Sequence, residues 1–257
     1  MMNDMKKIYL MMVMALVALG GCAYHNPLED FRLQTQMTPP FVLSSWHRIN
    51  AYGEPIRIYI EGDDASSTEQ GFPTTNPTPT SDFFRTIASE DSAQNVAYLA
   101  QPCQYLQAGS CSSETWGSGR FSKQSVDSMT QAVLNLMKKA GAKKATLIGY
   151  GGGAQLAGLI ALKEPGKIVE VITLAGVWDY QKWAEYHGFP AFKDSISLTE
   201  WRKKKDTIKQ THFVGEKDTV VPPELAQKWA SNVVVVKGAT HDKGYKKIYS
   251  KLYGEKE

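Results

Sequence analysis

Two residues near the end of the chain have the types and spacing of an acid–base pair. Asp218 stands just beyond an apolar run that predicts a strand (208–215), and His241 stands just beyond the next one (232–238). In acyl transfer such an aspartate orients the imidazole, and the imidazole takes the proton of a nucleophile. An earlier glycine-rich corner, "GYGGG" (149–153), places Gly151 where that nucleophile would be expected, and glycine has no side chain to attack with.

This corner fits the nucleophile elbow G-x-S-x-G, a strand-to-helix turn that lifts a serine above the sheet. Gly149, Tyr150 and Gly153 match the pattern, and Gly151 replaces the serine. The order along the chain, with the elbow first, then the acid and then the histidine, is the order of α/β-hydrolase triads. The sequence therefore predicts Gly151, Asp218 and His241 as the catalytic positions, with the nucleophile's side chain lost.

Two other interpretations of the glycine cluster remain open. Gly149, Gly151 and Ala154 also satisfy the dinucleotide-binding pattern G-x-G-x-x-A, but the acidic residue expected at the end of the next strand is Glu170, which comes early in it. Alternatively, the corner is only a close approach of helix to strand. In that case Asp218 caps the following helix and His241 is an ordinary loop histidine.

From Pro55 to about Ile248 the chain resembles a group of exported bacterial α/β-hydrolase-fold proteins, many of them lipoproteins. The stretches that carry the resemblance include "IYIEGD", "NVAYLAQPCQY", "ETWGSGRFS", "LIGYGGG", "LAGVWD", "GEKDTVVP" and "THDKGY". It implies a mostly parallel central sheet with helices on both faces and a small cap segment.

The resemblance also implies an oxyanion hole, a set of amides that stabilise negative charge in the transition state. Gly62 and Asp63 lie on the loop that would provide one amide, and Gly152, directly after the nucleophile position, would provide the other. The chain departs from the family at Gly151 and at Asp64, where a small residue is usual. A carboxylate that pointed into this hole would repel a developing oxyanion.

Strand and helix patterns alternate along the chain, as in an α/β sheet with crossover helices. Helical spacing of apolar residues from Val126 to Ala140 predicts one helix, residues 152–163 a second, and 245–253 a final amphipathic segment. A Ser/Thr/Pro/Gly-rich stretch (63–81) predicts a long loop, which in a compact domain is usually functional or mobile. The predicted strands are 56–62, 95–101, 144–150, 168–176, 208–215 and 232–238.

The first residues have the pattern of an export signal. Lys6 and Lys7 precede an apolar run (8–19) that is short for a membrane-spanning helix, and "LGGC" ends at Cys22. This resembles a bacterial lipobox, which implies lipidation of Cys22. Ala23, where inner-membrane retention signals place Asp, implies the outer membrane, facing the periplasm. An ordinary secretory signal is the alternative. We expect a signal peptide (1–21), a tether (22–40) and one α/β-hydrolase-fold domain (41–257).

The two other cysteines, Cys103 and Cys111, are close in the sequence. Export to an oxidising compartment makes an even pair with a short loop a predicted disulfide. A metal site is the weaker alternative because no histidine or further cysteine stands nearby to complete four ligands. We expect no metal.

The net charge of +3 and the absence of a dense basic stripe argue against nucleic-acid binding. We expect no cofactor, and two partners: a membrane, through the lipid anchor, and an unidentified small molecule or protein. The leading hypothesis is a hydrolase-fold lipoprotein that has lost serine hydrolysis and binds a ligand or partner. The alternatives are a hydrolase of esters, lipids or peptides that uses water or another nucleophile, and a purely structural lipoprotein with no pocket beneath the cap (179–200). Trp183, Tyr186 and Phe189 belong to that cap.

Overall fold

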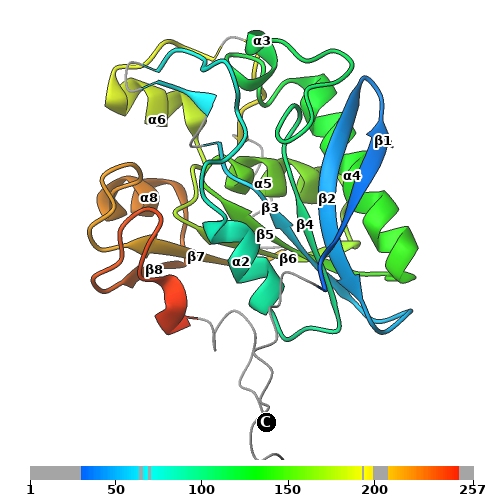
Figure 1. Cartoon of the computed structure of the whole chain (residues 1–257). Coiled ribbons are helices and arrows are strands. Elements are labelled where there is room, and N and C mark those ends of the chain that lie inside the picture. Colours follow the sequence, from blue (N-terminus) through cyan, green and yellow to red (C-terminus); the bar gives the residue numbers. More distant parts are fainter. Residues whose placement is uncertain (1–29, 64–65, 69–70, 193, 199–207, 249–257) are drawn as a thin grey trace, which may run out of the picture.

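A computed structural model describes residues 30–63, 66–68, 71–192, 194–198 and 208–248 (Figure 1). Its centre is an eight-stranded sheet in the order β1-β2-β4-β3-β5-β6-β7-β8. β3 to β8 run parallel to one another, whereas β2 is antiparallel to both β1 and β4. The strands are β1 (Arg32–Thr38), β2 (Phe41–Ile49), β3 (Ile56–Ile60), β4 (Asn95–Leu99), β5 (Ala145–Tyr150), β6 (Ile168–Leu174), β7 (Lys209–Gly215) and β8 (Val233–Val236).

All six strands predicted from the sequence are present, each a little shorter than expected. The predicted helices are α4 (Lys123–Ala140) and α5 (Gly153–Lys163). The final amphipathic segment begins as the 3-10 helix η4 (Tyr245–Ile248), and its remainder lies outside the described residues. The other helices are α2 (Phe83–Glu90), α3 (Ser113–Trp116), α6 (Tyr180–His187) and α8 (Pro223–Trp229).

The predicted tether is wrong over residues 32–38, which form the edge strand β1. Its pattern is inverted for a strand: the polar Gln36 and Thr38 are buried, whereas Leu33 and Met37 are 61% and 68% exposed. Hydrogen bonds compensate the burial, since the Gln36 amide donates to Ser45 Oγ at 3.0 Å. Because β1 belongs to the sheet, the folded domain starts earlier than residue 41. The strand lacks the usual apolar alternation, so the sequence pattern does not predict it.

Two apolar clusters cover the two faces of the sheet. α4, α5 and α8 pack on one face, and α2 with η4 covers the other. α4 has a clear reason to begin and end where it does. Ser122 accepts from the Ser125 amide at its start, and Gly141 adopts the left-handed conformation (φ 65°) at its end. The layers hold the carboxyl ends of the parallel strands at one edge of the molecule.

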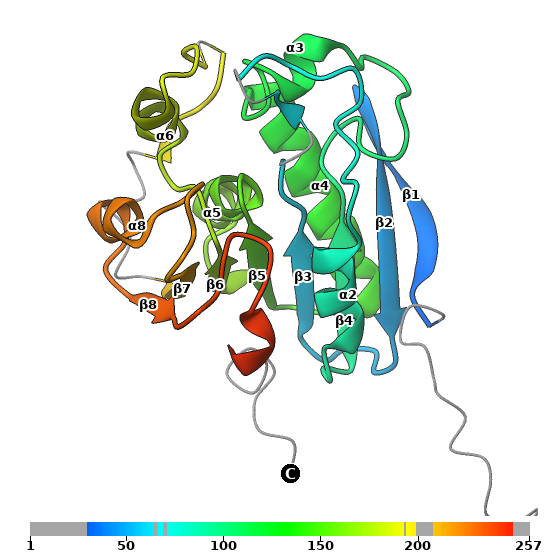
Figure 2. The ribbon, with the colours of Figure 1, turned by 60° about the vertical axis from the view of Figure 1, so that its left-hand side comes forward.

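The cap lies beyond that edge. Figures 1 and 2 both show α6 and α3 above the upper ends of the strands, with the loop after β3 beside them. The predicted disulfide is present: Cys103 and Cys111 are bonded, with Cα atoms 5.7 Å apart. Among the described residues, no helix has the length and apolar character needed to cross a membrane.

Candidate functional site

The corner between β5 and α5 has the backbone of a nucleophile elbow. Gly151 has φ +49°, a left-handed conformation at the tip of a tight strand-to-helix turn. Its carbonyl accepts from the Val177 amide at 2.9 Å, which fixes the corner against the segment after β6. A Cβ at Gly153 would stand 2.3 Å from the Ile60 carbonyl oxygen, so this close approach requires glycine. The predicted elbow position is therefore a real turn, and it carries no side chain.

The predicted acid and base are in contact. His241 Nδ1 lies 2.9 Å from Asp218 Oδ2 and 3.1 Å from Oδ1. The Asp218 carboxylate is itself held by the amides of Val220 and Val221, each at 2.8 Å. This arrangement fixes the imidazole with Nδ1 toward the acid, which is how a general base is oriented. His241 and Gly151 line the same cavity.

A second carboxylate lies against the Gly152 amide, which the sequence predicts as an oxyanion donor. Asp63 Oδ1 accepts from the Gly152 amide at 2.8 Å. Asp63 Oδ2 accepts from the Tyr180 hydroxyl at 2.8 Å and forms a salt bridge with the Arg120 guanidinium. The side chains of Asp63 and Arg120 are only 9% and 2% exposed, so the pair is shielded from water.

The other predicted oxyanion amide is also engaged. The Gly62 N–H donates to Glu61 Oε1 at 2.6 Å, and Glu61 Oε2 accepts from the Tyr98 hydroxyl. Of the oxyanion hole predicted from Gly62, Asp63 and Gly152, the Gly62 and Gly152 amides are therefore already occupied in this structure. The predicted departure at Asp64 lies outside the described residues, and it is the side chain of Asp63 that carries the opposing charge.

Arg120 and Tyr180 contact Asp63 in the site, although the sequence patterns do not predict them there. Arg120 Nε donates to the Gly117 carbonyl at 3.1 Å, and its Nη2 donates to Ser67 at 2.9 Å. Asp63 is 57 residues from Arg120 and 117 from Tyr180 along the chain. The only signal in the sequence was an arginine in the small-residue stretch "GSGRFS", which does not reveal its partner.

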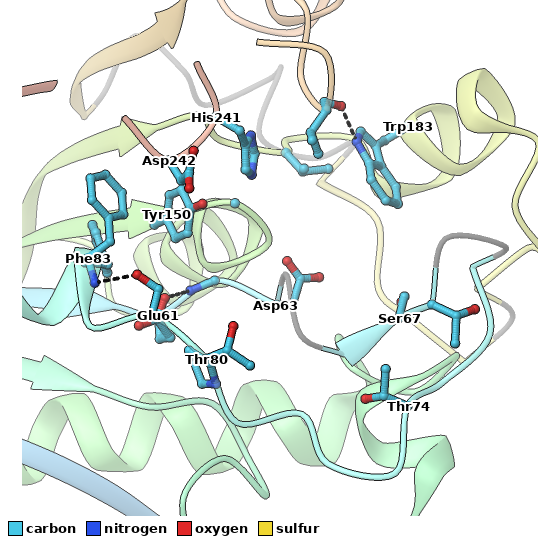
Figure 3. Close-up of a pocket in the computed structure, with 18 of the residues that line it drawn as sticks. Glu61, Asp63, Ser67, Thr74, Thr80, Phe83, Tyr150, Trp183, His241 and Asp242 are labelled. Carbon is cyan, nitrogen blue, oxygen red and sulfur yellow. Dashed lines mark hydrogen bonds between the residues drawn. The ribbon is translucent and has the colours of Figure 1, made fainter. Parts of the chain in front are cut away.

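A cavity of about 810 Å³ opens above the corner, between the loop after β3 and the cap. Figure 3 shows Asp63, Thr74, Trp183 and His241 around the same open space. Of the three predicted cap aromatics, Trp183 and Phe189 line the cavity, whereas Tyr186 is 53% exposed. The volume of the cavity lies within the range of small-molecule binding sites.

Burial and nearby carboxylates shift the pKa values of two tyrosines near the site. Burial raises the pKa of Tyr98 well above its ordinary value, and the neighbouring Glu61 carboxylate raises it further. Burial likewise raises the pKa of Tyr245, and the nearby charge of Asp218 adds to that effect. Both tyrosines stay protonated at neutral pH, so the Tyr98 hydroxyl remains a donor to Glu61.

Two features bear on cofactors and metals. Glu170, the acid considered for dinucleotide binding, is the third residue of β6 and forms a salt bridge with Lys209 at 2.8 Å. It is therefore not at the strand end where such an acid would meet a ribose. Within the described ranges, no cluster of three or more His, Cys, Asp or Glu side chains could hold a metal ion.

The comparisons with known proteins agree with this architecture. No protein-family model and no curated protein matches the chain. Solved structures do. An esterase from Pyrococcus furiosus is 15% identical with a TM-score of 0.58, covering 91% of this chain and 92% of its own.

Two further solved structures are similar to a comparable degree. An α/β serine hydrolase homologue from Coxiella burnetii is 15% identical with a TM-score of 0.55, covering 86% of this chain and 93% of its own. An esterase domain from Rhodothermus marinus is 14% identical with a TM-score of 0.54, covering 86% and 94%. The chain therefore has the α/β-hydrolase fold, as the sequence predicted.

Proposed function

We propose that this chain is an envelope lipoprotein that uses a hydrolase fold to bind a ligand or partner and does not perform serine hydrolysis. The observation that carries the proposal is the pair of changes at one corner. Gly151 stands at the elbow, and the Asp63 carboxylate occupies the Gly152 amide.

Each change removes a separate requirement of acyl transfer. Without an oxygen or sulfur at residue 151, His241 has no side-chain nucleophile to deprotonate at the elbow. With the Gly62 and Gly152 amides bonded to carboxylates, a developing negative charge at these positions meets negative charge instead of N–H donors. The buried bond to Arg120 holds Asp63 in place, so the blockage is part of the folded core.

A binding role is supported by the cavity that remains. It is lined from two sides, by the loop after β3 and by α6, and includes the aromatic side chains of Trp183 and Phe189. A purely structural protein would need no such space beneath its cap. The cavity therefore favours binding over a structural role.

Activity-based labelling tests the loss of serine chemistry. The purified chain is incubated with a fluorophosphonate probe and, separately, with short and medium acyl esters, beside an active serine esterase. We expect neither covalent labelling nor turnover above the rate without protein. Stoichiometric labelling, or turnover that such a probe inhibits, would overturn the proposal.

Hydrolysis by a water molecule is the second candidate, favoured by the intact hydrogen bonds between Asp218 and His241. His241 would then act as a general base toward water. In that case weak ester turnover would survive fluorophosphonate treatment and would disappear in His241→Ala. Turnover that His241→Ala leaves unchanged would exclude this role.

Membrane attachment through Cys22 is part of the same proposal, and Cys22 lies outside the described residues. Support comes from the lipobox-like "LGGC". In a bacterial host, the chain should fractionate with outer membranes, and Cys22→Ala should release it or leave it unprocessed. Equal membrane association of the two forms would refute lipidation at this residue.

A further inference from the structure

The charged side chains around the cavity have one sign. Among the described residues that line it, the carboxylates are Glu61, Asp63 and Asp242, and no lysine or arginine is present. The two lining histidines are held by other groups: His241 by Asp218, and His187 Nε2 by the Val220 carbonyl at 2.9 Å. A negatively charged ligand would therefore enter a space without a cationic side chain to receive it.

The three carboxylates do not contribute equally. The salt bridge to Arg120 largely cancels the charge of Asp63. Glu61 is 3% exposed at the floor of the cavity and is held by hydroxyl and amide donors. Asp242 is exposed and accepts from Thr240 Oγ1 at 3.2 Å. Asp242 follows His241 in the chain, and the ring centroids of His241 and Tyr150 lie 5.3 Å apart; Figure 3 labels all three residues on one side of the cavity. Glu61 and Asp242 therefore provide negative charge at two places around the cavity.

The effect of these charges extends to neighbouring tyrosines. After burial, the charge of Glu61 is the next largest cause that raises the pKa of Tyr98, and Asp242 contributes to the raised pKa of Tyr245. The two tyrosines lie on different sides of the site, since Tyr98 belongs to β4 and Tyr245 to η4. The carboxylates of Glu61 and Asp242 thus act on groups at both sides of the site.

Aromatic rings form much of the remaining lining. Phe83 and Tyr150 lie 5.6 Å apart between ring centroids on one side, and Trp183 and Phe189 lie 5.2 Å apart on the other. Ring faces carry partial negative charge and attract ammonium groups, and tryptophan is the strongest of them. The same rings bury apolar surface. Aromatic walls and carboxylates thus favour the same class of ligand.

We propose that the cavity binds an organic cation: a molecule with an apolar or aromatic body and an ammonium group placed among Glu61, Asp242 and the aromatic rings. This inference rests on the proposed function, because it names the ligand class of the same site. It also implies that carboxylates and phosphates of similar size are rejected, since the Gly152 amide and Arg120 are already occupied by Asp63.

A matched series of ligands tests the proposal. Phenylethylammonium, phenylethanol and phenylacetate share one ring and differ in charge, and each is titrated calorimetrically into the full chain at constant ionic strength near neutral pH. We expect the cation to bind roughly tenfold more tightly than the alcohol, or better, and the anion to bind most weakly. Asp242→Asn should reduce the advantage of the cation severalfold and leave phenylethanol binding unchanged.

Asp127→Asn is the matched control, because Asp127 lies on α4, outside the cavity lining, and pairs with Lys123 and Lys163. It should change none of the three affinities. Equal affinities for all three ligands, tighter binding of phenylacetate, or no saturable binding at millimolar concentrations would each overturn the proposal.

The two proposals fail in distinguishable ways. Selective cation binding together with fluorophosphonate-sensitive ester turnover would refute the loss of serine chemistry and leave the ligand class standing. Absence of turnover together with a preference for the anion would refute the proposed ligand class and leave the loss of serine chemistry standing.

Discussion

Restoring a serine at the elbow should not restore hydrolysis. In Gly151→Ser the new hydroxyl would stand at a turn whose acid and base are in place, since His241 Nδ1 is 2.9 Å from Asp218 Oδ2. The left-handed backbone (φ +49°) costs a non-glycine residue about 1–2 kcal/mol, which serine hydrolases tolerate at the same turn. The limiting problem is the oxyanion, because Asp63 occupies the Gly152 amide.

The size of that obstacle follows from the geometry. Asp63 Oδ1 lies 2.8 Å from the Gly152 nitrogen, and a substrate oxyanion would have to approach the same nitrogen to about 2.9 Å. Two unit charges about 4 Å apart repel by about 4 kcal/mol at an effective dielectric constant of about 20, and Arg120 offsets part of this. Loss of a single oxyanion donor alone costs about 10²–10³ in kcat.

The decisive comparison adds a second change. Gly151→Ser/Asp63→Ala frees the Gly152 amide, so its ester turnover should exceed that of Gly151→Ser by about 10²–10³. Asp63→Ala alone should remain inactive, and adding His241→Ala should abolish the gain. Because Asp63→Ala leaves the buried Arg120 unpaired, at a cost of about 3–5 kcal/mol, a version that also carries Arg120→Met keeps the test possible if the first does not fold.

Steady-state hydrolysis of short acyl esters and fluorophosphonate labelling provide the readouts, with thermal unfolding as the check on folding. If Gly151→Ser alone hydrolyses esters as fast as the double variant, the carboxylate of Asp63 does not block the site. Occupation of the Gly152 amide by Asp63 would then not be what prevents hydrolysis, whatever the role of the cavity.

Three further predictions concern stability. Burial lowers the pKa of His212 from 6.5 to about 3, so the unfolded state takes up a proton on His212 at a higher pH than the folded state does. The contribution of His212 to the free energy of unfolding is therefore complete above about pH 6.5 and should fall by about 2 kcal/mol at pH 5. Chemical denaturation at the two pH values should show a smaller loss in a folded His212→Gln variant. A Cβ at Gly152 would lie 2.5 Å from the Asp63 carboxylate. Gly152→Ala should therefore destabilise the wild-type chain much more than it destabilises the Asp63→Ala variant. Additive losses of stability in a double-mutant cycle would contradict this contact. Reducing the Cys103–Cys111 bond, which spans a separation of 8 residues, should cost about 2–3 kcal/mol, and an unchanged melting temperature would refute that estimate.

Much of the fold could be predicted because its signals are local. The parallel strands are short apolar runs, and the β5–α5 corner is marked by glycines that the close packing of strand and helix requires. The edge strand β1 escaped because it buries Gln36 and Thr38 and exposes Leu33 and Met37, so hydrogen bonds replace the usual apolar pattern.

The site could be predicted only in part, for a related reason. Asp218 and His241 follow successive strands, and parallel strands bring their carboxyl ends together, so their contact could be expected from order alone. Asp63 and Gly152 likewise follow the adjacent parallel strands β3 and β5. The other partners of Asp63, Arg120 and Tyr180, come from segments with no such regular relation to it. The direction of a side chain decides whether a carboxylate assists or blocks a neighbouring amide, and no periodicity in the sequence encodes that direction.

The contacts of Asp63 also explain how the corner can be stable without a catalytic role. α5 begins after Gly152, whose N–H has no partner within the helix, and Asp63 accepts from this N–H from 89 residues away. Its negative charge also lies at the positive end of the helix dipole. Through Arg120 and Tyr180 the same carboxylate joins the loop after β3 to the cap. An oxyanion hole must keep its amides available for substrate, whereas a structural joint must satisfy them internally. Because one amide cannot do both, the proposed function implies that the contacts that stabilise this corner would also exclude serine hydrolysis.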